Sequence, residues 1–396
     1  MTALSGVRRR RTGMMLLANL VVLAAVGGLL YTGVKALARY QGAKNTSVAT
    51  IPIPLTPVGM VATVDDKNKL TSVAVFVEKP NGRGGGSIVN VPISADSTEG
   101  TDGQYIPLSE AYDTGGADGL TQAVESVLSL TVDESAVRTP DELTAMLAPF
   151  GPFKVTFPTK VAATDKTGTV TLYPRGVNNM SANQMTIAMN ARVKDQREAT
   201  RLPNIQAIWA GLSAAIGQGR GSPTTGDATS FDQLAAQVFA GPVLSRGLPV
   251  IALASGVGGG KDVDTLDRPE AVMVFATIAP NHMSAVMLGL NFRIEAPPGY
   301  DDRVKFVVRA LLYLNSNVQW VYTNGPVHAE TIVFLNDPTL SGQAAGSELI
   351  FKKVTTKEPE YRIEGVDVIV QIGTDYLNDT SLNALPATTT TSTIPD

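Results

Sequence analysis

The sequence predicts an α/β fold in three parts: an N-terminal transmembrane helix, a mixed-sheet α/β domain, and a small α+β (βαββαβ) C-terminal domain. Three observations predict it: one long uncharged run near the N-terminus, apolar runs typical of buried strands alternating with helical spacing, and a regular element order at the end. The 44% hydrophobic content is enough for buried cores, and 17% charged residues exclude a disordered acidic chain.

The N-terminal segment has the features of a membrane anchor. Residues 12–34 contain no charged residue, and a helix of this length crosses the ~30 Å hydrocarbon layer. Four consecutive arginines end at Arg11, and the positive-inside rule keeps such residues cytoplasmic. We therefore expect a single-pass protein with a basic tip (1–11) in the cytoplasm and its body outside. The alternative is a signal peptide cleaved after Ala38.

Two further segments are predicted to lie outside the folded domains. Residues 35–68 are expected to form an extended Pro-rich linker, because prolines alternate at Pro52 and Pro54. Residues 380–396 are rich in Thr and are expected to be disordered. The mixed-sheet domain then occupies 69–285.

Within that domain, a hairpin is predicted first. Continuous apolar runs on either side of a Pro-Asn-Gly turn indicate two buried strands, 73–77 and 87–91. Apolar spacing of three and four residues, typical of amphipathic helices, follows further along, and Ser181 is a candidate N-cap. The predicted helices are 120–130, 181–192, 202–216 and 231–239, and the further predicted strands are 250–254 and 271–278.

The C-terminal domain, 286–379, is predicted from a strand-helix-strand-strand-helix-strand order. One amphipathic stripe carries Val304, Val307 and Leu311. The predicted strands are 290–294, 318–322, 331–335 and 366–372, and the predicted helices are 301–314 and 343–352.

Composition excludes several kinds of site. The chain has no Cys and only two His, His282 and His328, so disulfides, Cys-zinc sites, thiol nucleophiles and three-His metal centres are excluded. The first 44 residues hold seven Lys and Arg and no acid, which leaves 25 basic against 36 acidic residues in the rest of the chain. An acidic body is a poor match for phosphate backbones, and we expect no nucleic-acid partner.

Two glycine-rich segments are interpreted as turns rather than nucleotide sites. Gly82–Gly86 lies between two predicted strands, which favours a hairpin turn. In the second segment a phosphate loop would need Gly at Ser255 and Ser or Thr at Asp262. We interpret His328 as a strand-edge residue and His282 as part of a turn.

Several segments occur in an order known from one family. They are the hairpin from Val73 to Pro92, the stretch Tyr105–Gly116, the helix 120–130, Leu143–Phe157, and the helix pair Ser181–Trp209. Together they resemble the LytR–CpsA–Psr domain of bacterial cell-envelope proteins. Residues 286–379 resemble the LytR C-terminal domain, with hallmarks at Glu330–Val333 and Gly373–Tyr376.

The resemblance implies a location at the bacterial cytoplasmic membrane and a reaction there. Family members transfer a phosphate-linked glycopolymer from a polyprenyl carrier to peptidoglycan, which needs guanidinium groups, usually Mg2+, and an apolar slot for the carrier. Arg192 and Arg201 fit two family arginines, and Asp96 fits a family aspartate. These three residues are the candidate pyrophosphate site, and Asp96 is also a candidate metal ligand.

Other positions depart from the family pattern. Pro-Arg-Asp reads Pro92-Ile93-Ser94-Ala95-Asp96, the Asp-Thr that opens the first strand reads Leu70-Thr71, and Arg-Gln after Arg201 reads Asn204-Ile205. Loss of one charge-stabilising donor costs ~10²–10³ in rate. We therefore predict a catalytically degenerate member that binds a polyprenyl-linked glycopolymer, peptidoglycan or another envelope protein. No cofactor is then expected, whereas an active enzyme would require Mg2+.

Two alternatives stay open. One is an active phosphotransferase whose arginines come from other positions, such as Arg175 or Arg197; the other is an unrelated surface scaffold with a generic α/β pattern. Arg192 and Arg201 also fit plain surface arginines, ion-paired with Asp195 or Glu198 at helical spacing.

Overall fold

The computed structural model describes residues 31, 35, 49–80, 82, 84–98, 103–220, 228–253, 258–351 and 353–379. The predicted basic tip, almost all of the predicted anchor 12–34, the cleavage position at Ala38 and the predicted tail 380–396 lie outside these residues. Within the described part, no helix is both long and apolar enough to cross a membrane. The chain divides into two units, Met1–Ala49 and Thr50–Asp396, and all that follows concerns the second.

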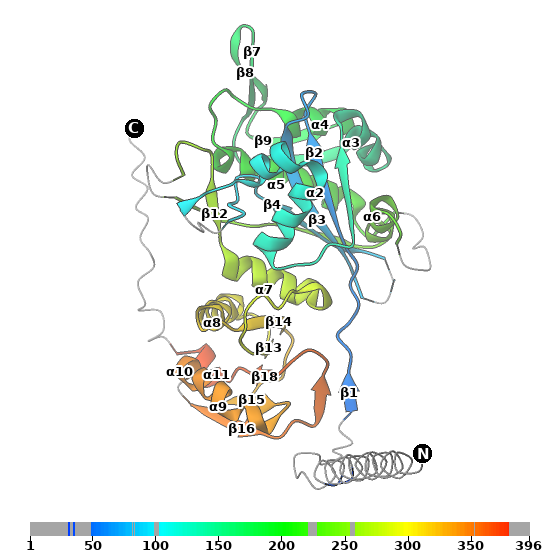
Figure 1. Ribbon diagram of the computed structural model, residues 1–396. Helices are drawn as coiled ribbons and strands as arrows, with labels where there is room; N and C mark the ends of the chain where they lie inside the picture. The colour runs from blue at the N-terminus through cyan, green and yellow to red at the C-terminus, as the bar shows by residue number, and fades with distance from the viewer. Residues whose placement is uncertain are drawn as a thin grey trace, which may run out of the picture. The chain divides into compact units, whose positions relative to one another are not determined.

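A five-stranded mixed sheet lies at the centre of the first part of this unit, in the order β10-β4-β3-β2-β5 (Figure 1). Strand β2 is antiparallel to β3 and β3 to β4, whereas β10 runs parallel to β4 and β5 parallel to β2. The predicted mixed sheet and the hairpin β3–β4 are therefore confirmed. The strands are β2 (Val58–Val64), β3 (Leu70–Glu78), β4 (Gly86–Val91), β5 (Glu134–Arg138) and β10 (Val243–Gly247).

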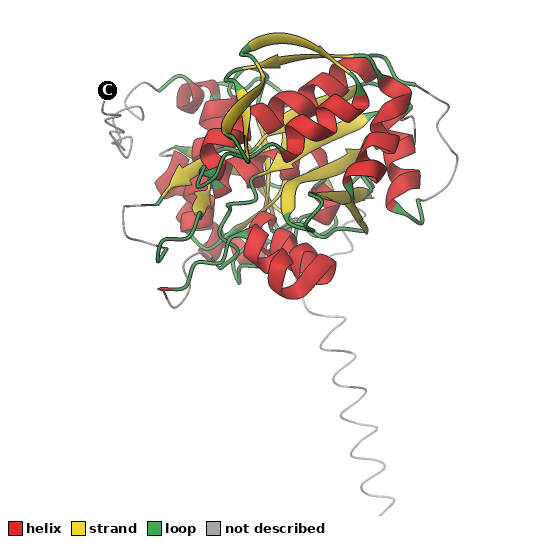
Figure 2. Cartoon of the chain, turned by 90° about the horizontal axis from the view of Figure 1, so that it is seen from above, coloured by secondary structure: helices red, strands yellow, loops and turns green. Residues whose placement is uncertain are grey.

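Helices cover both faces of this sheet, as Figure 2 shows from above. Successive side chains of β3 alternate between two cores: Val73 and Val75 belong to one, Ala74 and Phe76 to the other. Burial on both faces explains why its sequence is a continuous apolar run. The first core packs against α2 (Leu108–Leu128) and α7 (Arg268–Ile278), and the second against α3 (Pro140–Leu147), α4 (Ala182–Asn190), α5 (Glu198–Ile216) and α6 (Phe231–Phe239).

The structure corrects the predicted linker 35–68. Residues Val58–Val64 form β2, which is buried along its whole length and pairs with strands on both sides. The prolines that suggested an extended linker end at Pro57, immediately before this strand. A Pro-rich entry into a strand was therefore misread as a longer linker. Upstream lies the short strand β1 (Ala49–Ile51).

The structure also corrects the predicted strand 271–278, which is helix α7. The Asp267 side chain accepts a hydrogen bond from the Glu270 amide at 3.3 Å, and Pro269 lies in the first turn, a typical helix start. Ala271 to Ala276 are all buried, so this helix has no polar stripe. Periodicity alone cannot distinguish such a helix from a buried strand.

The remaining predicted helices are present: α6 has the predicted ends, and the others have changed ends. Helix α4 has the predicted cap at Ser181, completed by Gln184 as a capping box. Helix α5 starts at Glu198, four residues before the predicted start. Helix α2 begins well before residue 120 and kinks at Gly116, whose φ of 62° and ψ of −149° suit glycine.

Three two-stranded ribbons complete this part. They are β6 (Phe153–Phe157) with β9 (Gly176–Met180), the hairpin β7 (Val161–Asp165) with β8 (Gly168–Tyr173), and β11 (Val250–Ala252) with β12 (Asp264–Leu266). The described residues of both glycine segments form turns, as predicted: Gly84–Gly85 precedes β4, and Gly258–Gly260 lies before β12.

The C-terminal part contains a second mixed sheet in the order β14-β13-β18-β15-β16. All four predicted strands and the helix 301–314 are present, whereas the predicted helix 343–352 is divided into short helical turns. Two short strands, β16 and β17, were not predicted. The elements are β13 (Asn291–Glu295), α8 (Asp301–Tyr313), β14 (Asn317–Tyr322), β15 (Thr331–Leu335), α9 (Ser341–Ala344), α10 (Glu348–Phe351), β16 (Val354–Lys357), β17 (Tyr361–Ile363), β18 (Val368–Gln371) and α11 (Thr374–Leu377).

Phe76 in β3 is the aromatic centre of the second core. It is fully buried, and its ring lies edge-on to Trp209, Phe231 and Phe239 at centroid distances of 5.9, 5.2 and 5.7 Å. We expect Phe76→Ala to lower the free energy of unfolding by ~3–5 kcal/mol in urea titrations, because it leaves a cavity among three rings.

Tyr313→Ala is the matched control, because Tyr313 is 87% exposed and its truncation should change the free energy of unfolding by no more than ~0.5 kcal/mol. Equal effects of the two substitutions would contradict this packing.

Candidate functional site

The guanidinium of Arg201, in the first turns of α5, donates hydrogen bonds to other groups of the same chain. Its side chain is 4% exposed. Nε donates to Glu198 Oε2 at 3.0 Å and Nη2 to Glu198 Oε1 at 3.2 Å. Nη1 donates to the carbonyl of Met189 at 2.5 Å, and Nη2 also donates to the carbonyl of Thr71. The guanidinium therefore joins α5, the end of α4 and the start of β3.

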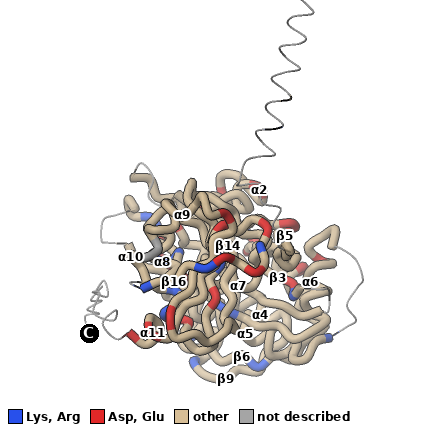
Figure 3. Tube along the Cα trace, turned by 90° about the horizontal axis from the view of Figure 1, so that it is seen from below, with Lys and Arg blue, Asp and Glu red and all other residues tan. Residues whose placement is uncertain are grey.

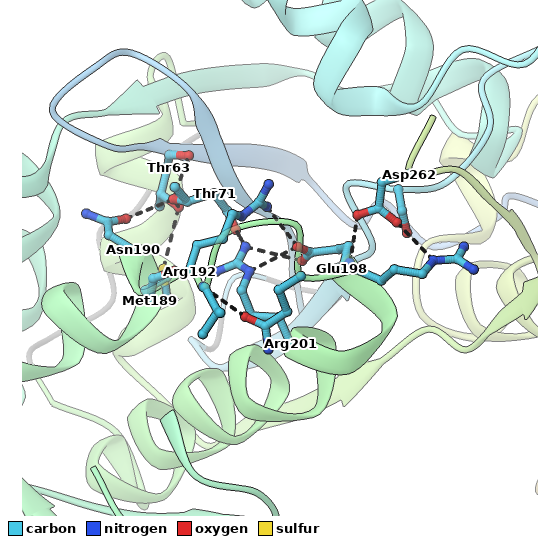
Figure 4. Close-up of polar contacts among 12 residues, drawn as sticks. Thr63, Thr71, Met189, Asn190, Arg192, Glu198, Arg201 and Asp262 are labelled. Carbon is cyan, nitrogen blue, oxygen red and sulfur yellow. Dashed lines mark hydrogen bonds and ion pairs between the residues drawn. The ribbon is translucent and has the colours of Figure 1, made fainter. Parts of the chain in front are cut away.

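Glu198 is the anion at the centre of this arrangement. It is 3% exposed, and its carboxylate accepts from Arg201 and, at 2.9 Å, from Arg192 Nη2. Figure 4 shows Arg192 and Arg201 both directed at Glu198. The predicted pairing at helical spacing is therefore confirmed for Arg201, whereas Arg192 reaches Glu198 from the loop between α4 and α5, six residues away. The prediction of two surface arginines is wrong for Arg201, which is buried, whereas Arg192 remains 44% exposed.

A second set of charges surrounds the start of α5. The Glu198 amide donates to Asp262 Oδ2 at 2.7 Å, so a carboxylate occupies the positive end of the helix dipole. Arg197 contacts Asp262 at 3.4 Å and Asp264 at 2.8 Å. Asp264 is fully buried and also accepts from Ser94 at 2.8 Å. Three arginines thus face three carboxylates of the same chain.

Burial dominates the electrostatics of the pair. Loss of hydration raises the pKa of Glu198, an effect that the charges of Arg201 and Arg192 oppose. Loss of hydration lowers the pKa of Arg201, opposed by Glu198, and guanidinium groups nevertheless stay protonated in proteins. Burial likewise raises the pKa of Asp264, opposed by Ser94 and Arg197. The charges of Glu198, Arg201 and Asp264 are therefore stabilised in the protein interior by their oppositely charged partners.

The Asp96 carboxylate bonds to residues of its own loop, and no hydrogen bond or ion pair between it and Arg192 or Arg201 is seen among the described residues. Its Oδ1 accepts from the Thr98 amide at 3.1 Å, the Thr98 hydroxyl at 2.8 Å and the Ile106 amide at 2.9 Å. Its backbone amide donates to Asp264 O at 2.9 Å. The carboxylate therefore shapes the loop that leads to α2, and the three predicted site residues are not one cluster.

The residues present do not fit a magnesium site. Leu70, which stands where the family has the strand-opening aspartate, is 3% exposed and packs in the first core. The neighbouring Thr71 hydroxyl contacts Thr63 and Asn190, each at 2.9 Å. Over the residues that the structure describes, no group of three or more His, Asp or Glu side chains could hold a metal ion.

The other departures from the family pattern are core residues too. Ile93 is 2% exposed and packs in the first core, and Ile205 is 1% exposed and packs in the second. The Asn204 side chain bonds to the backbone: its Oδ1 accepts from the Thr159 amide and its Nδ2 donates to the Lys160 carbonyl, each at 3.4 Å. The positions where the resemblance led us to expect polar side chains are therefore occupied by residues that pack in the cores or bond to the backbone. Three cavities lie elsewhere among the described residues, and Arg192, Arg201 and Asp96 line none of these three.

Sequence reasoning missed half of this cluster. The sequence indicated Arg197 only as an alternative arginine and Asp262 only as a departure from the phosphate-loop pattern, and it did not single out Asp264. Their spacing from Arg197, 65 and 67 residues along the chain, carries no local signal. Glu198, three residues before Arg201, is the one acidic member of this cluster that helical spacing indicated.

The Glu198–Arg201 pair gives a stability prediction. Glu198→Ala should lower the free energy of unfolding by ~3–5 kcal/mol, because Arg201 would keep a buried charge without its carboxylate. Asp113→Ala removes the acid of an exposed pair with Lys69, where the side chains are 61% and 41% exposed, and should cost at most ~1 kcal/mol. Urea titrations of both variants check this. A Glu198→Ala effect no larger than the control would show that the pair is not a buried ionic contact.

Among the comparisons with known proteins, only the comparison with solved structures found proteins similar to this chain. No protein-family model and no curated protein matches it. Solved structures similar to it include Bacillus subtilis TagT (13% identity, TM-score 0.38, 55% of this chain and 88% of that one). They also include the LytR-Cps2A-Psr family protein TagT with bound octaprenyl pyrophosphate lipid (12%, 0.37, 55% and 85%) and a LytR-Cps2A-Psr enzyme from Actinomyces oris (15%, 0.36, 55% and 91%). Two of these solved structures are described as LytR-Cps2A-Psr proteins.

Proposed function

We propose that this chain is an envelope protein of the LytR–CpsA–Psr type that binds an anionic glycopolymer and does not transfer it. In this proposal residues 12–34 anchor it in the bacterial cytoplasmic membrane, with the body outside the cytoplasm. The family assignment is supported by the order of the segments between Leu70 and Gly217, three of whose strands, β3, β4 and β5, belong to the mixed sheet.

The observation that carries the proposal is the internal neutralisation of Arg201. A guanidinium that clamps a pyrophosphate must direct several N–H groups at it. In Arg201, Nε and Nη2 donate to Glu198, and Nη1 and Nη2 donate to main-chain carbonyls. A phosphate would have to displace a carboxylate already held at 3.0 Å. The buried part of the site is therefore occupied by the protein's own anion.

The requirements of transfer are not met by the neighbouring residues either. Phosphoryl transfer is driven mainly by stabilising charge on the moving group, through guanidinium groups and a metal ion. Here the metal carboxylate is replaced by a core leucine, Leu70, and one arginine position by a core isoleucine, Ile93. With these donors absent, binding is the activity that the remaining groups support.

Binding has a plausible contact surface at the rim of the cluster. Arg192 is 44% exposed and Arg197 51% exposed, so both can reach a ligand while keeping their internal partners. Exposed arginines of this kind hold a polyanion by multiple weak contacts. From below, Figure 3 shows Lys and Arg positions interspersed with Asp and Glu positions along the chain trace.

An active phosphotransferase is the second candidate. The observation in its favour is that three arginines within ten residues of sequence, Arg192, Arg197 and Arg201, do converge on one cluster. Turnover by that cluster would require Glu198 and Asp262 to release them.

Enzyme assays separate the two candidates. We expect the full chain, purified in detergent, to release no phosphate or pyrophosphate from octaprenyl pyrophosphate, with or without Mg2+, because Arg201 is not available to the transferred group. Thin-layer chromatography of the lipid product measures this. Turnover that is lost in Arg201→Lys would establish the phosphotransferase and end the binding-only proposal.

Binding assays test the proposed activity itself. Arg192→Ala should weaken binding of a purified anionic wall glycopolymer by about fivefold in calorimetry, the loss expected of one charge-assisted contact. Arg175→Ala is the matched control: it removes the same charge from an exposed turn between β8 and β9 and should leave the affinity unchanged. Equal affinities of the two variants would argue against a binding role for the cluster.

A further inference from the structure

The outer face of the C-terminal sheet carries a cavity of about 320 Å³. Its wall includes Phe334 of β15, Gln371 of β18 and Tyr361 of β17. His328, interpreted from sequence as a strand-edge residue, lies in the same wall and is half-buried. Cavities that bind small molecules start near ~300 Å³, so this one suits a ligand of one or two rings.

Register places the side chains of this face in two rows. Lys357, Phe334 and Ile369 are cross-strand partners in the first row, which continues through Arg293 to Trp320. Ile332, Gln371 and Glu295 lie in the second row. The alternate residues, such as Val333 and Val370, belong to the core on the other side of the sheet. The cavity thus lies over the β18, β15 and β16 side of this face, and Tyr361 of β17 closes one wall.

The floor beside the cavity is polar but internally neutral. Glu295 is 3% exposed and Arg293 8% exposed, and the two form an ion pair of 2.7 Å. The Arg293 guanidinium stacks on Trp320 at 3.8 Å from the ring centroid. Gln371 Nε2 donates to Glu295 Oε2 at 2.9 Å. The amide nitrogen of Gln371 is therefore engaged, and its amide oxygen is the acceptor that it offers to a ligand.

The remaining wall combines aromatic surface with both kinds of hydrogen-bonding group. Phe334, Tyr361 and the neighbouring Pro359 are each half-buried. Burial raises the pKa of Tyr361, and the nearby Glu295 carboxylate adds to the effect, so the phenol keeps its proton at neutral pH. Lys357 adds a donor, and the exposed Glu358 and Glu360 add acceptors. Two carboxylates against one ammonium disfavour an anionic ligand.

We propose that this cavity binds a neutral saccharide ring. A sugar presents an apolar C–H face, which an aromatic side chain accepts, and a rim of hydroxyls, which requires mixed donors and acceptors. The cavity supplies Tyr361 and Phe334 for the face, and Gln371, Lys357 and Glu360 for the hydroxyls. This site is separate from the arginine cluster, and it stands whether or not that cluster binds a glycopolymer.

Saturation-transfer NMR with the full chain in detergent tests the site. The neutral probe is N-acetylglucosamine and the anionic probe is glucuronate. We expect saturation transfer to the neutral sugar and a weaker or absent response for glucuronate. Tyr361→Ala should raise Kd for the neutral sugar by about fivefold, and Tyr361→Phe, which keeps the ring, by less than about twofold.

Tyr322→Ala is the matched control, because Tyr322 is an exposed tyrosine of the neighbouring strand β14 that does not line the cavity. It should leave Kd unchanged. Absence of transfer to wild type, equal Kd values for Tyr361→Ala and wild type, a loss in Tyr361→Phe as large as in Tyr361→Ala, or tighter binding of glucuronate would each overturn the proposal.

Discussion

The buried contact between Glu198 and Arg201 is the interaction on which the arginine cluster depends. Through it the first turn of α5 is fixed to the end of α4, at the carbonyl of Met189, and to the start of β3, at the carbonyl of Thr71. Both side chains are almost completely removed from water, so neither charge is tolerated without the other. The geometry of three chain segments therefore follows from one ion pair.

This ion pair also limits the chemistry of the cluster. A guanidinium stabilises a phosphoryl group only with donors that remain free to point at it, and those of Arg201 are directed at protein acceptors. Asp262 similarly occupies the start of α5, where an external anion would otherwise be favoured. Leu70, Ile93 and Ile205 are buried apolar side chains and offer no polar contact to a ligand. Arg192 and Arg197, half-exposed at the rim, are what remains for a ligand.

The C-terminal sheet also contains a buried ion pair, but this pair lies beside a cavity. Arg293 and Glu295 form it on a sheet face, with an aromatic ring stacked on the guanidinium. Charges paired within the floor leave a neutral polar wall. In both regions the protein neutralises its own buried charges, and the groups left at the surface decide which ligand class fits.

The sequence by itself determined the elements whose pattern is local: the hairpin β3–β4, the capped helix α4, helix α6 and the strands β13, β14, β15 and β18. It also singled out Arg192 and Arg201, which both pair with Glu198 in the structure. Tertiary structure decided the rest. An apolar run that is buried on every side is compatible with a strand or a helix, so α7 was predicted as a strand. Strand β2 was assigned to the linker because prolines precede it. Carboxylates more than 60 residues from Arg197 join it only because the chain folds back. Burial and long-range charge pairing leave no periodic trace in a sequence.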